Sequence, residues 1–329
     1  MQKMLRRIKD ILKDFSSQIK RFFPGEISGD VKNNLSKNQI YPIGVNLIKV
    51  LNEDSKHRLK DLNFSKELNI ASIGTCFAEE LSGYFNNQNK NYKYLSLEKN
   101  VFNFSANWGR VYTVRNLLQI ILYSLDNNSI PINVEKYKEY FFDPLREYST
   151  GTFPSREKAI YEIENHRELS KQVFFKADIL IITIGQNEFW HDSQMDIAWG
   201  STPPLSLRKS NQRFKAVEYS FSQNFKDLDY VIKNLKKFNP NLKIIFTVSP
   251  VAEYATFLNN NIVSQAFAGK AILRGVLHEI IPKYDGIFYF PSFEYVLTDN
   301  PNSFISDNRH VKRFKVNQII QSLEKAMLK

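Results

Sequence analysis

The chain has 329 residues, of which 43% are hydrophobic and 14% aromatic, so it can bury a large core as one domain or two. Its single cysteine, Cys76, excludes an internal disulfide, and no Cys/His cluster has zinc spacing. Because the N-terminus also lacks an apolar signal segment, we expect the protein to be in the reducing cytoplasm. The formal net charge is +11, and no apolar run approaches the roughly 18 to 20 residues that span a membrane.

The first segment of the chain is strongly basic. Residues 1–23 hold seven Lys or Arg against two Asp, which leaves a net charge of +5. Helical spacing puts apolar side chains on one face and basic ones on the other, so the segment would bind an anionic membrane surface, this protein's own body or a second copy. Pro24 and Gly25 end it, and we predict a basic helix and linker over residues 1–40 and one domain over residues 41–329.

Short apolar runs and amphipathic segments alternate through the rest of the chain. The runs are typical of buried parallel strands and cover residues 68–74, 177–185, 242–249 and 286–290. The amphipathic segments predict helices over residues 77–85, 111–125, 221–238, 265–281 and 315–328. This alternation predicts a three-layer α/β/α sandwich with a mostly parallel central sheet, whose ligands bind at the carboxyl ends of the strands.

Two regions interrupt the alternation, and we interpret them as insertions. They cover residues 127–170 and 192–213, and they form either substrate walls or surface elaborations. The chain has no glycine pattern of the Walker or dinucleotide type and no nucleic-acid motif, so neither a nucleotide nor a nucleic acid is expected as a ligand.

Cys76 lies in IASIGTCFAEEL, where the first apolar run gives way to a helix. The amides and the positive dipole end of a helix N-terminus favour a thiolate at this place. A lone cysteine is more often a small buried hydrophobe, so Cys76 by itself does not define a site.

Two other groups of polar residues suit the same chemistry. Residues 185–188 follow the second run and reach the same edge of the sheet as Cys76, where the Asn187 amide either stabilises an oxyanion or caps the loop. Near the C-terminus, Asp307 precedes His310 by three residues. That spacing lets the carboxylate orient the imidazole, whose other nitrogen would take a proton from a nucleophile.

The order of these features resembles that of the SGNH/GDSL hydrolase superfamily and, more narrowly, the GSCFA family. The motif that names the family reads GTCFA here, at residues 74–78. Five further segments that resemble the family follow in chain order: NWGRVYTVRNLLQII, TIGQNEFW, TVSPVAEY, KAILR and YFPSFEYV. One short match would be weak, but six in order are specific.

The resemblance implies a Cys–His–Asp triad. The superfamily's Gly-Asp-Ser falls on Gly74, Thr75 and Cys76, and its Asp-x-x-His falls on Asp307 and His310. Either Thr75 or Cys76 could be argued as the nucleophile. We assign Cys76, because a branched residue at the second motif position is better suited to support than to attack.

The resemblance also implies an oxyanion hole and a pocket. The oxyanion donors would be the Cys76 amide, a backbone amide near Gly109 and the Asn187 side chain, although Asn107 or Arg110 would face the pocket equally well. Other candidate pocket residues, each with an ordinary structural role as its alternative, are Thr75, Glu188, Trp190, His191, Ser249, Lys270 and Arg274.

The implied function is that of an esterase or acyltransferase with a cysteine nucleophile, acting on an acyl ester of a carbohydrate or a similar small substrate. No metal or cofactor is expected, but a transferase would need an acyl donor such as an acyl thioester. The alternative is a non-catalytic protein of the same fold that binds a glycan or a membrane surface, and a redox-sensing thiol would need a partner's cysteine. The expected location is the cytoplasm, with membrane contact through residues 1–23.

Overall fold

The computed structural model describes residues 9–11, 35, 39–42, 46–99, 102–126, 130–210, 212–299 and 303–328. The chain divides into two compact units, residues 1–49 and residues 50–329. The basic helix and linker predicted over residues 1–40 lie almost entirely outside the described residues. The predicted domain boundary at residue 41 and the membrane contact therefore stay predictions.

The central sheet has five strands in the order β11-β10-β6-β1-β2, and every neighbouring pair is parallel. The strands are β1 (Asn69–Gly74), β2 (Lys93–Tyr94), β6 (Ile179–Ile184), β10 (Lys243–Val248) and β11 (Ile287–Tyr289). All six residues of β6 are buried, as expected for a strand covered on both faces. The four apolar runs predicted as parallel strands are confirmed, and the two-residue β2 was too short to give a pattern.

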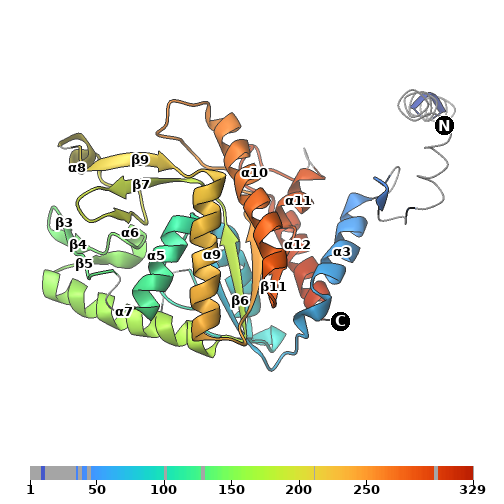
Figure 1. Ribbon diagram of the computed structural model, residues 1–329, viewed down its shortest axis with the longest axis horizontal. Coiled ribbons are helices and arrows are strands. Elements are labelled where there is room, and N and C mark those ends of the chain that lie inside the picture. Colours follow the sequence, from blue (N-terminus) through green and yellow to red (C-terminus); the bar gives the residue numbers. More distant parts are fainter. Residues whose placement is uncertain are drawn as a thin grey trace. The chain divides into compact units, whose positions relative to one another are not determined.

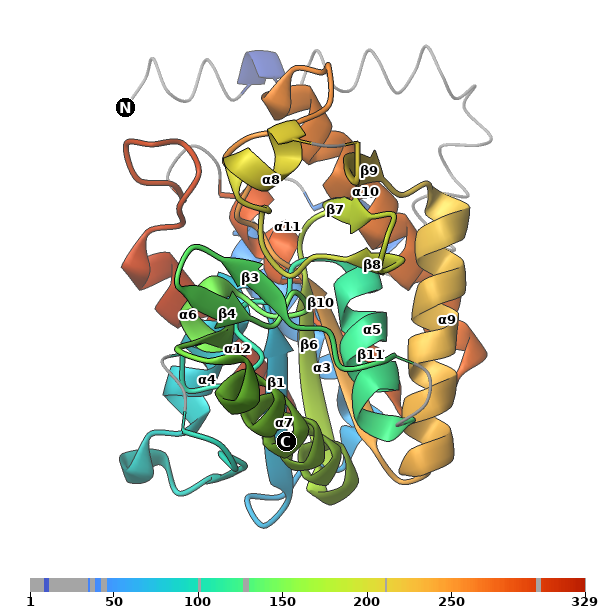
Figure 2. The ribbon, with the colours of Figure 1, turned by 90° about the vertical axis from the view of Figure 1, so that its left-hand side faces the viewer.

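Helices form a layer on each face of this sheet (Figures 1 and 2). One layer contains α5 (Val114–Leu125), α7 (Arg156–Lys176), α9 (Phe221–Phe238) and α10 (Ile262–Ile280). The other contains α4 (Cys76–Phe85), α11 (Ser292–Leu297) and α12 (Arg313–Met327). The predicted three-layer α/β/α sandwich is therefore confirmed.

Side-chain caps set where the helices begin. Helix α9 has the predicted bounds, because Ser220 and Gln223 form a capping box at its start. Helix α5 begins at Val114, three residues later than predicted, because Thr113 is its N-cap and accepts a hydrogen bond from the Asn116 amide at 3.1 Å.

Two small antiparallel sheets interrupt the alternation. The first lies within the predicted insertion at 127–170, whereas the second extends beyond the predicted range 192–213 at both ends. The first consists of β3 (Glu135–Tyr137), β4 (Tyr140–Phe142) and β5 (Thr152–Phe153), with the short helix α6 (Tyr148–Gly151) between β4 and β5. The second consists of β7 (Glu188–Asp192), β8 (Ile197–Ala198) and β9 (Phe214–Glu218), with α8 (Leu205–Ser210) before β9. The first predicted insertion also includes most of α7, which belongs to the helical layer. Helix α7 was not predicted because its apolar residues are too sparse for a clear amphipathic pattern.

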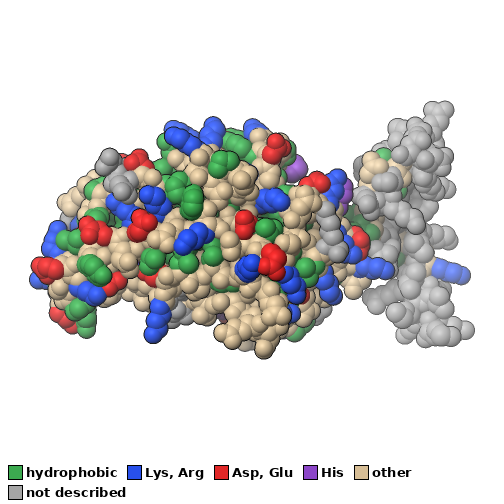
Figure 3. Space-filling view, turned by 90° about the horizontal axis from the view of Figure 1, so that it is seen from below, with side chains coloured by type: hydrophobic (Ala, Val, Ile, Leu, Met, Phe, Trp, Pro, Cys, Tyr) green, Lys and Arg blue, Asp and Glu red, His purple; other side chains and the backbone are tan. Residues whose placement is uncertain are grey.

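The remaining described elements are α3 (Leu47–Arg58) and the short 3-10 helices η2 (Lys60–Leu62), η3 (Gln88–Lys90) and η4 (Ile281–Lys283). Among the described residues, no helix is both long and apolar enough to cross a bilayer. Basic and acidic side chains are interspersed over the face shown in Figure 3.

Candidate active site

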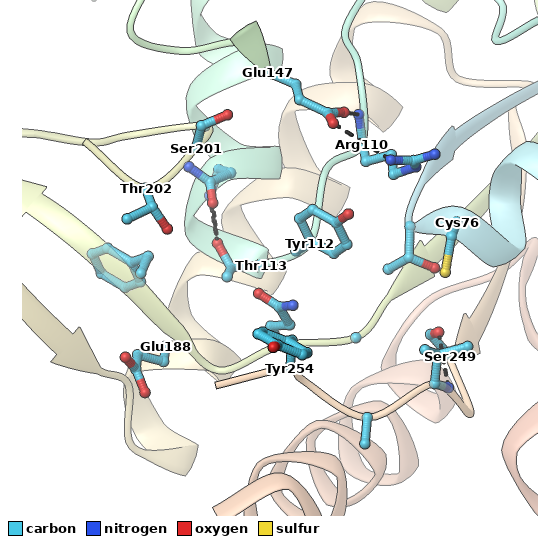
Figure 4. Close-up of a pocket in the computed structure, with 18 of the residues that line it drawn as sticks. Cys76, Arg110, Tyr112, Thr113, Glu147, Glu188, Ser201, Thr202, Ser249 and Tyr254 are labelled. Atoms are coloured by element: carbon cyan, nitrogen blue, oxygen red, sulfur yellow. Dashed lines mark hydrogen bonds and ion pairs between the residues drawn. The ribbon is translucent and has the colours of Figure 1, made fainter. Parts of the chain in front are cut away.

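The carboxyl ends of three neighbouring strands meet around a cavity of about 490 Å³. Cys76 follows β1, Gly185 and Gln186 follow β6, and Ser249 follows β10, and all four residues line the cavity. Figure 4 shows the labelled residues around it. This edge is where open α/β sheets bind their ligands.

The turn between β1 and α4 fixes the place of Cys76. Gly74 has φ +141°, and a Cβ there would lie 2.2 Å from the Thr183 carbonyl oxygen, so only glycine fits. The Thr75 amide and hydroxyl bind the Thr183 hydroxyl at 2.8 and 2.9 Å, and the Thr75 hydroxyl also accepts from the Phe77 amide at 3.2 Å. The Thr75 hydroxyl thus supports the turn and caps α4, while the half-buried Cys76 lines the cavity.

Burial raises the pKa of the Cys76 thiol, and this effect outweighs the cations Arg110 and Lys270, which lower it. The position at a helix N-terminus had predicted the opposite direction. The structure differs because the thiol is largely enclosed and Glu79 adds a nearby negative charge. The resting thiol is therefore neutral at neutral pH, and it needs a base to become a nucleophile.

We expect iodoacetamide to alkylate Cys76 with a pH midpoint above about 8.5, the ordinary value for a thiol. A raised pKa means that the folded protein holds the thiol proton more tightly than the unfolded chain does. The contribution of this group to folding stability is therefore complete below about 8.5 and is lost as the pH rises through the pKa of the folded state. Replacing Arg110 by methionine should raise the midpoint further, since the guanidinium favours the thiolate.

The matched control for this titration is Arg115→Met. The Arg110 and Arg115 side chains are both 29% exposed, but Arg115 pairs with Asp227 rather than influencing Cys76. A wild-type midpoint below 8.5, or equal midpoints for the two arginine variants, would contradict the role of burial and of Arg110.

The structure joins Asp307 and His310 as the spacing predicted. Asp307 Oδ2 lies 2.5 Å from His310 Nδ1, and Asp307 Oδ1 accepts the backbone amides of Arg309 and His310 at 2.9 Å each. These amides and the imidazole lower the pKa of Asp307 to about 2. The carboxylate is therefore ionised at neutral pH and holds the imidazole with Nε2 as its free acceptor position.

His310 lines the same cavity as Cys76, but its Nε2 accepts a hydrogen bond from Arg309 Nη2 at 3.0 Å. Within the described part of the chain, no hydrogen bond joins the Cys76 sulfur to His310. Cys76 and His310 thus line one cavity and Asp307 binds the imidazole from behind, while the Arg309 guanidinium lies on His310 Nε2.

Two predicted oxyanion donors lie elsewhere than expected. Gly109 is buried, and a Cβ there would lie 2.7 Å from that of Glu147, so the glycine packs against this residue rather than lining the cavity. Asn187 is also buried: its Nδ2 donates to the Tyr219 carbonyl and its Oδ1 accepts from Asn224, at 2.5 Å each. These contacts hold the Asn187 amide away from the cavity.

The amide side chain that lines the cavity belongs to Gln186, the residue before Asn187. The sequence analysis placed both residues at the strand end and assigned the oxyanion role to Asn187, which the structure does not place in the lining. Which of the two faces the cavity depends on the contacts of Asn187 with residues of β9 and α9, which are distant in sequence.

The other predicted pocket residues divide into two groups. Those that line the cavity are Thr75, Arg110, Glu188, Trp190 and Ser249. Those that do not are Asn107, which binds the Thr150 carbonyl; His191, which pairs with Asp196; Arg274, which pairs with Glu294; and Lys270. Lys270 is buried and donates to the Gly185 carbonyl at 2.6 Å, so it supports the strand end after β6.

Several lining residues were not found by reading the sequence. Glu147 comes from the first predicted insertion and Ser201 and Thr202 from the second, so both insertions form walls of the cavity. Tyr112 and Tyr254 complete the lining near Cys76 and Ser249 (Figure 4). The insertions carried a signal, since long segments after strand ends often wall a site. Tyr112 and Tyr254 lie in two of the segments that resemble the family, NWGRVYTVRNLLQII and TVSPVAEY, but no role was assigned to either.

Among the described residues, no group of three or more His, Cys, Asp or Glu side chains is arranged to hold a metal ion.

Fold and site together define an α/β protein with a Cys–His–Asp group at the carboxyl edge of a parallel sheet. The chain belongs to the GSCFA family, whose model matches residues 69–323. This confirms the family that the six ordered motifs predicted.

A search of curated proteins gives no significant match. Among solved structures, the fold is similar to a Clostridium thermocellum family 3 carbohydrate esterase, with 10% identity, a TM-score of 0.38 and coverage of 78% of this chain and 94% of the other. It is also similar to the periplasmic domain of a lipopolysaccharide acetyltransferase from Salmonella ser. Paratyphi A, with 13% identity, a TM-score of 0.35 and coverage of 87% and 98%. Similarity at this level carries no information on activity or substrate.

Proposed function

We propose that this protein is an esterase or acyltransferase that forms a thioester between Cys76 and the acyl group of an ester substrate. The observation that carries the proposal is the arrangement of the three residues: Cys76 and His310 line one cavity, and Asp307 holds the imidazole through Nδ1. Nucleophile, base and orienting carboxylate are the parts that acyl transfer requires.

In the first half-reaction, the Cys76 sulfur attacks the ester carbonyl carbon while its proton passes to His310 Nε2. The bond from this carbon to the alcohol oxygen then breaks, and the alcohol leaves with the proton from His310. In the second half-reaction, water or an acceptor hydroxyl gives a proton to His310 and its oxygen attacks the thioester carbonyl carbon. The bond from this carbon to the sulfur then breaks, the acid or the new ester is released, and the sulfur takes the proton back from His310. Because the resting thiol is neutral, His310 must act as a general base in the first step.

Donors for the oxyanion are available at the nucleophile turn. Cys76 is the first residue of α4, and amides in a first helical turn have no carbonyl partner within the helix. The Gln186 side chain is the second donor that we propose, in place of Asn187. Each such donor contributes about 3 to 4 kcal/mol of transition-state stabilisation.

The cavity lining favours a carbohydrate ester among possible substrates. Trp190 and Tyr254 provide flat apolar surfaces, and Arg110, Glu147 and Glu188 provide charged groups that could hydrogen-bond hydroxyls. Binding sites of this kind combine aromatic surfaces with a few placed polar groups. A sugar offers both matching features, which are C–H faces and a ring of hydroxyl groups.

The alternative function is a non-catalytic protein that binds a glycan ester or a similar ligand. One observation favours it: Arg309 occupies His310 Nε2, so the triad is not closed in this structure. A binding protein would keep its ligand affinity when His310 is replaced by glutamine and would show no turnover in either form.

The test of the proposed function is to trap the acyl group on the enzyme. After brief exposure of the full chain to p-nitrophenyl acetate and an acid quench, we expect intact-mass analysis to show one added acetyl group in wild type. Peptide analysis should place the acetyl group on Cys76. Asp307→Asn, which weakens the base but leaves the thiol, serves as a slow-acylation control. An acetyl group found only on lysines, at equal levels in wild type and Cys76→Ala, would contradict the proposal.

A further inference from the structure

A second cavity lies beside the catalytic one, between α10, α11 and the loops at residues 250–254 and 304–309. Its volume is about 650 Å³, and most of its lining is apolar. The apolar residues that bear on its use are Ile262, Val263, Ala266, Phe267, Phe293 and Leu297. At about 30 Å³ per water-sized group, the volume holds about 22 such groups, which is room for a medium-length or long aliphatic chain.

Large apolar side chains remain exposed around this second cavity. Phe267 is 58% exposed and Val263 62%, and both project from the same side of α10. Single exposed apolar residues are ordinary, but several that surround one hollow mark a binding surface.

The polar groups of the second cavity include a buried carboxyl oxygen. Glu253 Oε2 is buried and has no hydrogen-bond partner among the described residues. Lys270, also in the lining, is buried with its ammonium on the Gly185 carbonyl. Burial raises the pKa of Glu253, so this carboxyl is poised to share a hydrogen bond with a polar group of a ligand.

The second cavity adjoins the catalytic one. Ala252, Tyr254 and Arg309 line both. The Arg309 guanidinium donates to the Ala252 carbonyl at 3.2 Å and to His310 Nε2 at 3.0 Å, and it lies 5.7 Å from the centre of the Tyr254 ring. Arg309 therefore separates the two cavities, and the same rotation that frees His310 also opens the passage between them.

We propose that the second cavity binds the aliphatic acyl chain of the ester substrate, so that the carbonyl enters the catalytic cavity past Arg309. This rests on the proposed function. It assigns the polar cavity to the alcohol part of the ester and the apolar cavity to the acyl part. The ester carbonyl oxygen would accept a hydrogen bond from the displaced Arg309. This bond would replace the one that the guanidinium makes to His310 Nε2.

A smaller cavity offers a competing place for the acyl group. It measures about 100 Å³ and is lined by Cys76, His310 and apolar residues that include Val251 and Ile319. This space holds about three water-sized groups, enough for an acetyl group but not for a longer chain. The two assignments predict opposite preferences for chain length.

The first measurement is binding of cis-parinaric acid, a fluorescent fatty acid, to the full chain carrying Cys76→Ala, which separates binding from catalysis. Adding Phe267→Asp should weaken binding at least about tenfold, because it removes a phenylalanine contact and charges the cavity. The matched control is Phe175→Asp, since Phe175 is 64% exposed on α7 and lines neither cavity. Equal affinities for the two variants would overturn the proposal, as they would show the probe bound elsewhere, including on residues 1–23.

The second measurement is kcat/KM for p-nitrophenyl esters from acetate to decanoate. We expect it to rise by about fourfold for each methylene that the second cavity buries. Phe267→Asp should flatten this series, whereas the control Phe175→Asp should leave the series as it is in wild type. A maximum at acetate would overturn the assignment in favour of the small cavity while leaving the proposed function intact. If cis-parinaric acid binds and Phe267→Asp weakens its binding, but no ester is turned over, the proposed function alone is contradicted.

The same variant tests whether the second cavity is instead covered by a second copy of the chain. If Phe267→Asp converts a dimer to a monomer in light scattering without changing the affinity for cis-parinaric acid, the apolar cavity is a protein interface and the proposal is overturned.

Discussion

Cys76→Ala is expected to reduce ester turnover by at least about 10³-fold, because it removes the sulfur that we propose carries the acyl intermediate. The side chain is small, half-buried and free of any disulfide, so the variant should fold normally. Turnover of p-nitrophenyl butyrate with purified protein, compared at equal folded concentration by circular dichroism, measures the effect.

Thr75→Ser is the control for the choice of nucleophile. It keeps the hydroxyl that binds Thr183 and caps α4, so turnover should stay within about tenfold of wild type. Equal turnover in Cys76→Ala and wild type would rule out the thiol mechanism. A loss confined to Thr75 variants would transfer the role of nucleophile to the hydroxyl.

His310→Ala is expected to reduce turnover by roughly 10² to 10⁴-fold, which is the contribution of a positioned general base. The expectation is strong here because burial keeps the Cys76 thiol protonated, so little thiolate exists without the base. The His310 and Asp307 side chains are 47% and 40% exposed, so the loss should not reflect unfolding. Steady-state kinetics between pH 6 and 9 would measure it, and the deficit should shrink as rising pH ionises the thiol.

Two further variants serve as controls for His310→Ala. His278→Ala, which changes an exposed histidine of α10, should leave turnover unchanged. Asp307→Asn should lower turnover less than His310→Ala, since the imidazole remains but loses its carboxylate partner. If His310→Ala lowers kcat at every pH by no more than His278→Ala does, His310 is not the base.

Asp307 also makes the stability of the site depend on pH in the acid range. Its lowered pKa means that the ionised carboxylate stabilises the folded site above its ordinary pKa of about 3.9, and that this contribution is lost as the pH falls toward 2. The orientation of His310 is therefore maintained throughout the neutral and mildly acidic range, and changes in turnover near neutral pH arise from other groups.

The sequence by itself determined the features that depend on short stretches of chain. Continuous apolar runs specify strands buried on both faces, so residues 177–185 already indicated β6 and with it a parallel sheet. The spacing of Asp307 and His310 specifies a contact between near neighbours in the chain, which the structure shows at 2.5 Å. Gly74, Thr75 and Cys76 form a strand-to-helix turn, and its local geometry follows from the residues themselves.

Only the tertiary structure decided which side chains face the cavity. Gln186 rather than Asn187 lines it because Asn187 is held by Tyr219 and Asn224, and the thiol pKa is raised because segments far apart in the chain enclose Cys76. The second cavity and the position of Arg309 between the two cavities likewise arise where distant segments meet. Local patterns fix backbone conformation over a few residues, whereas the direction and burial of a side chain depend on neighbours that the sequence pattern does not name.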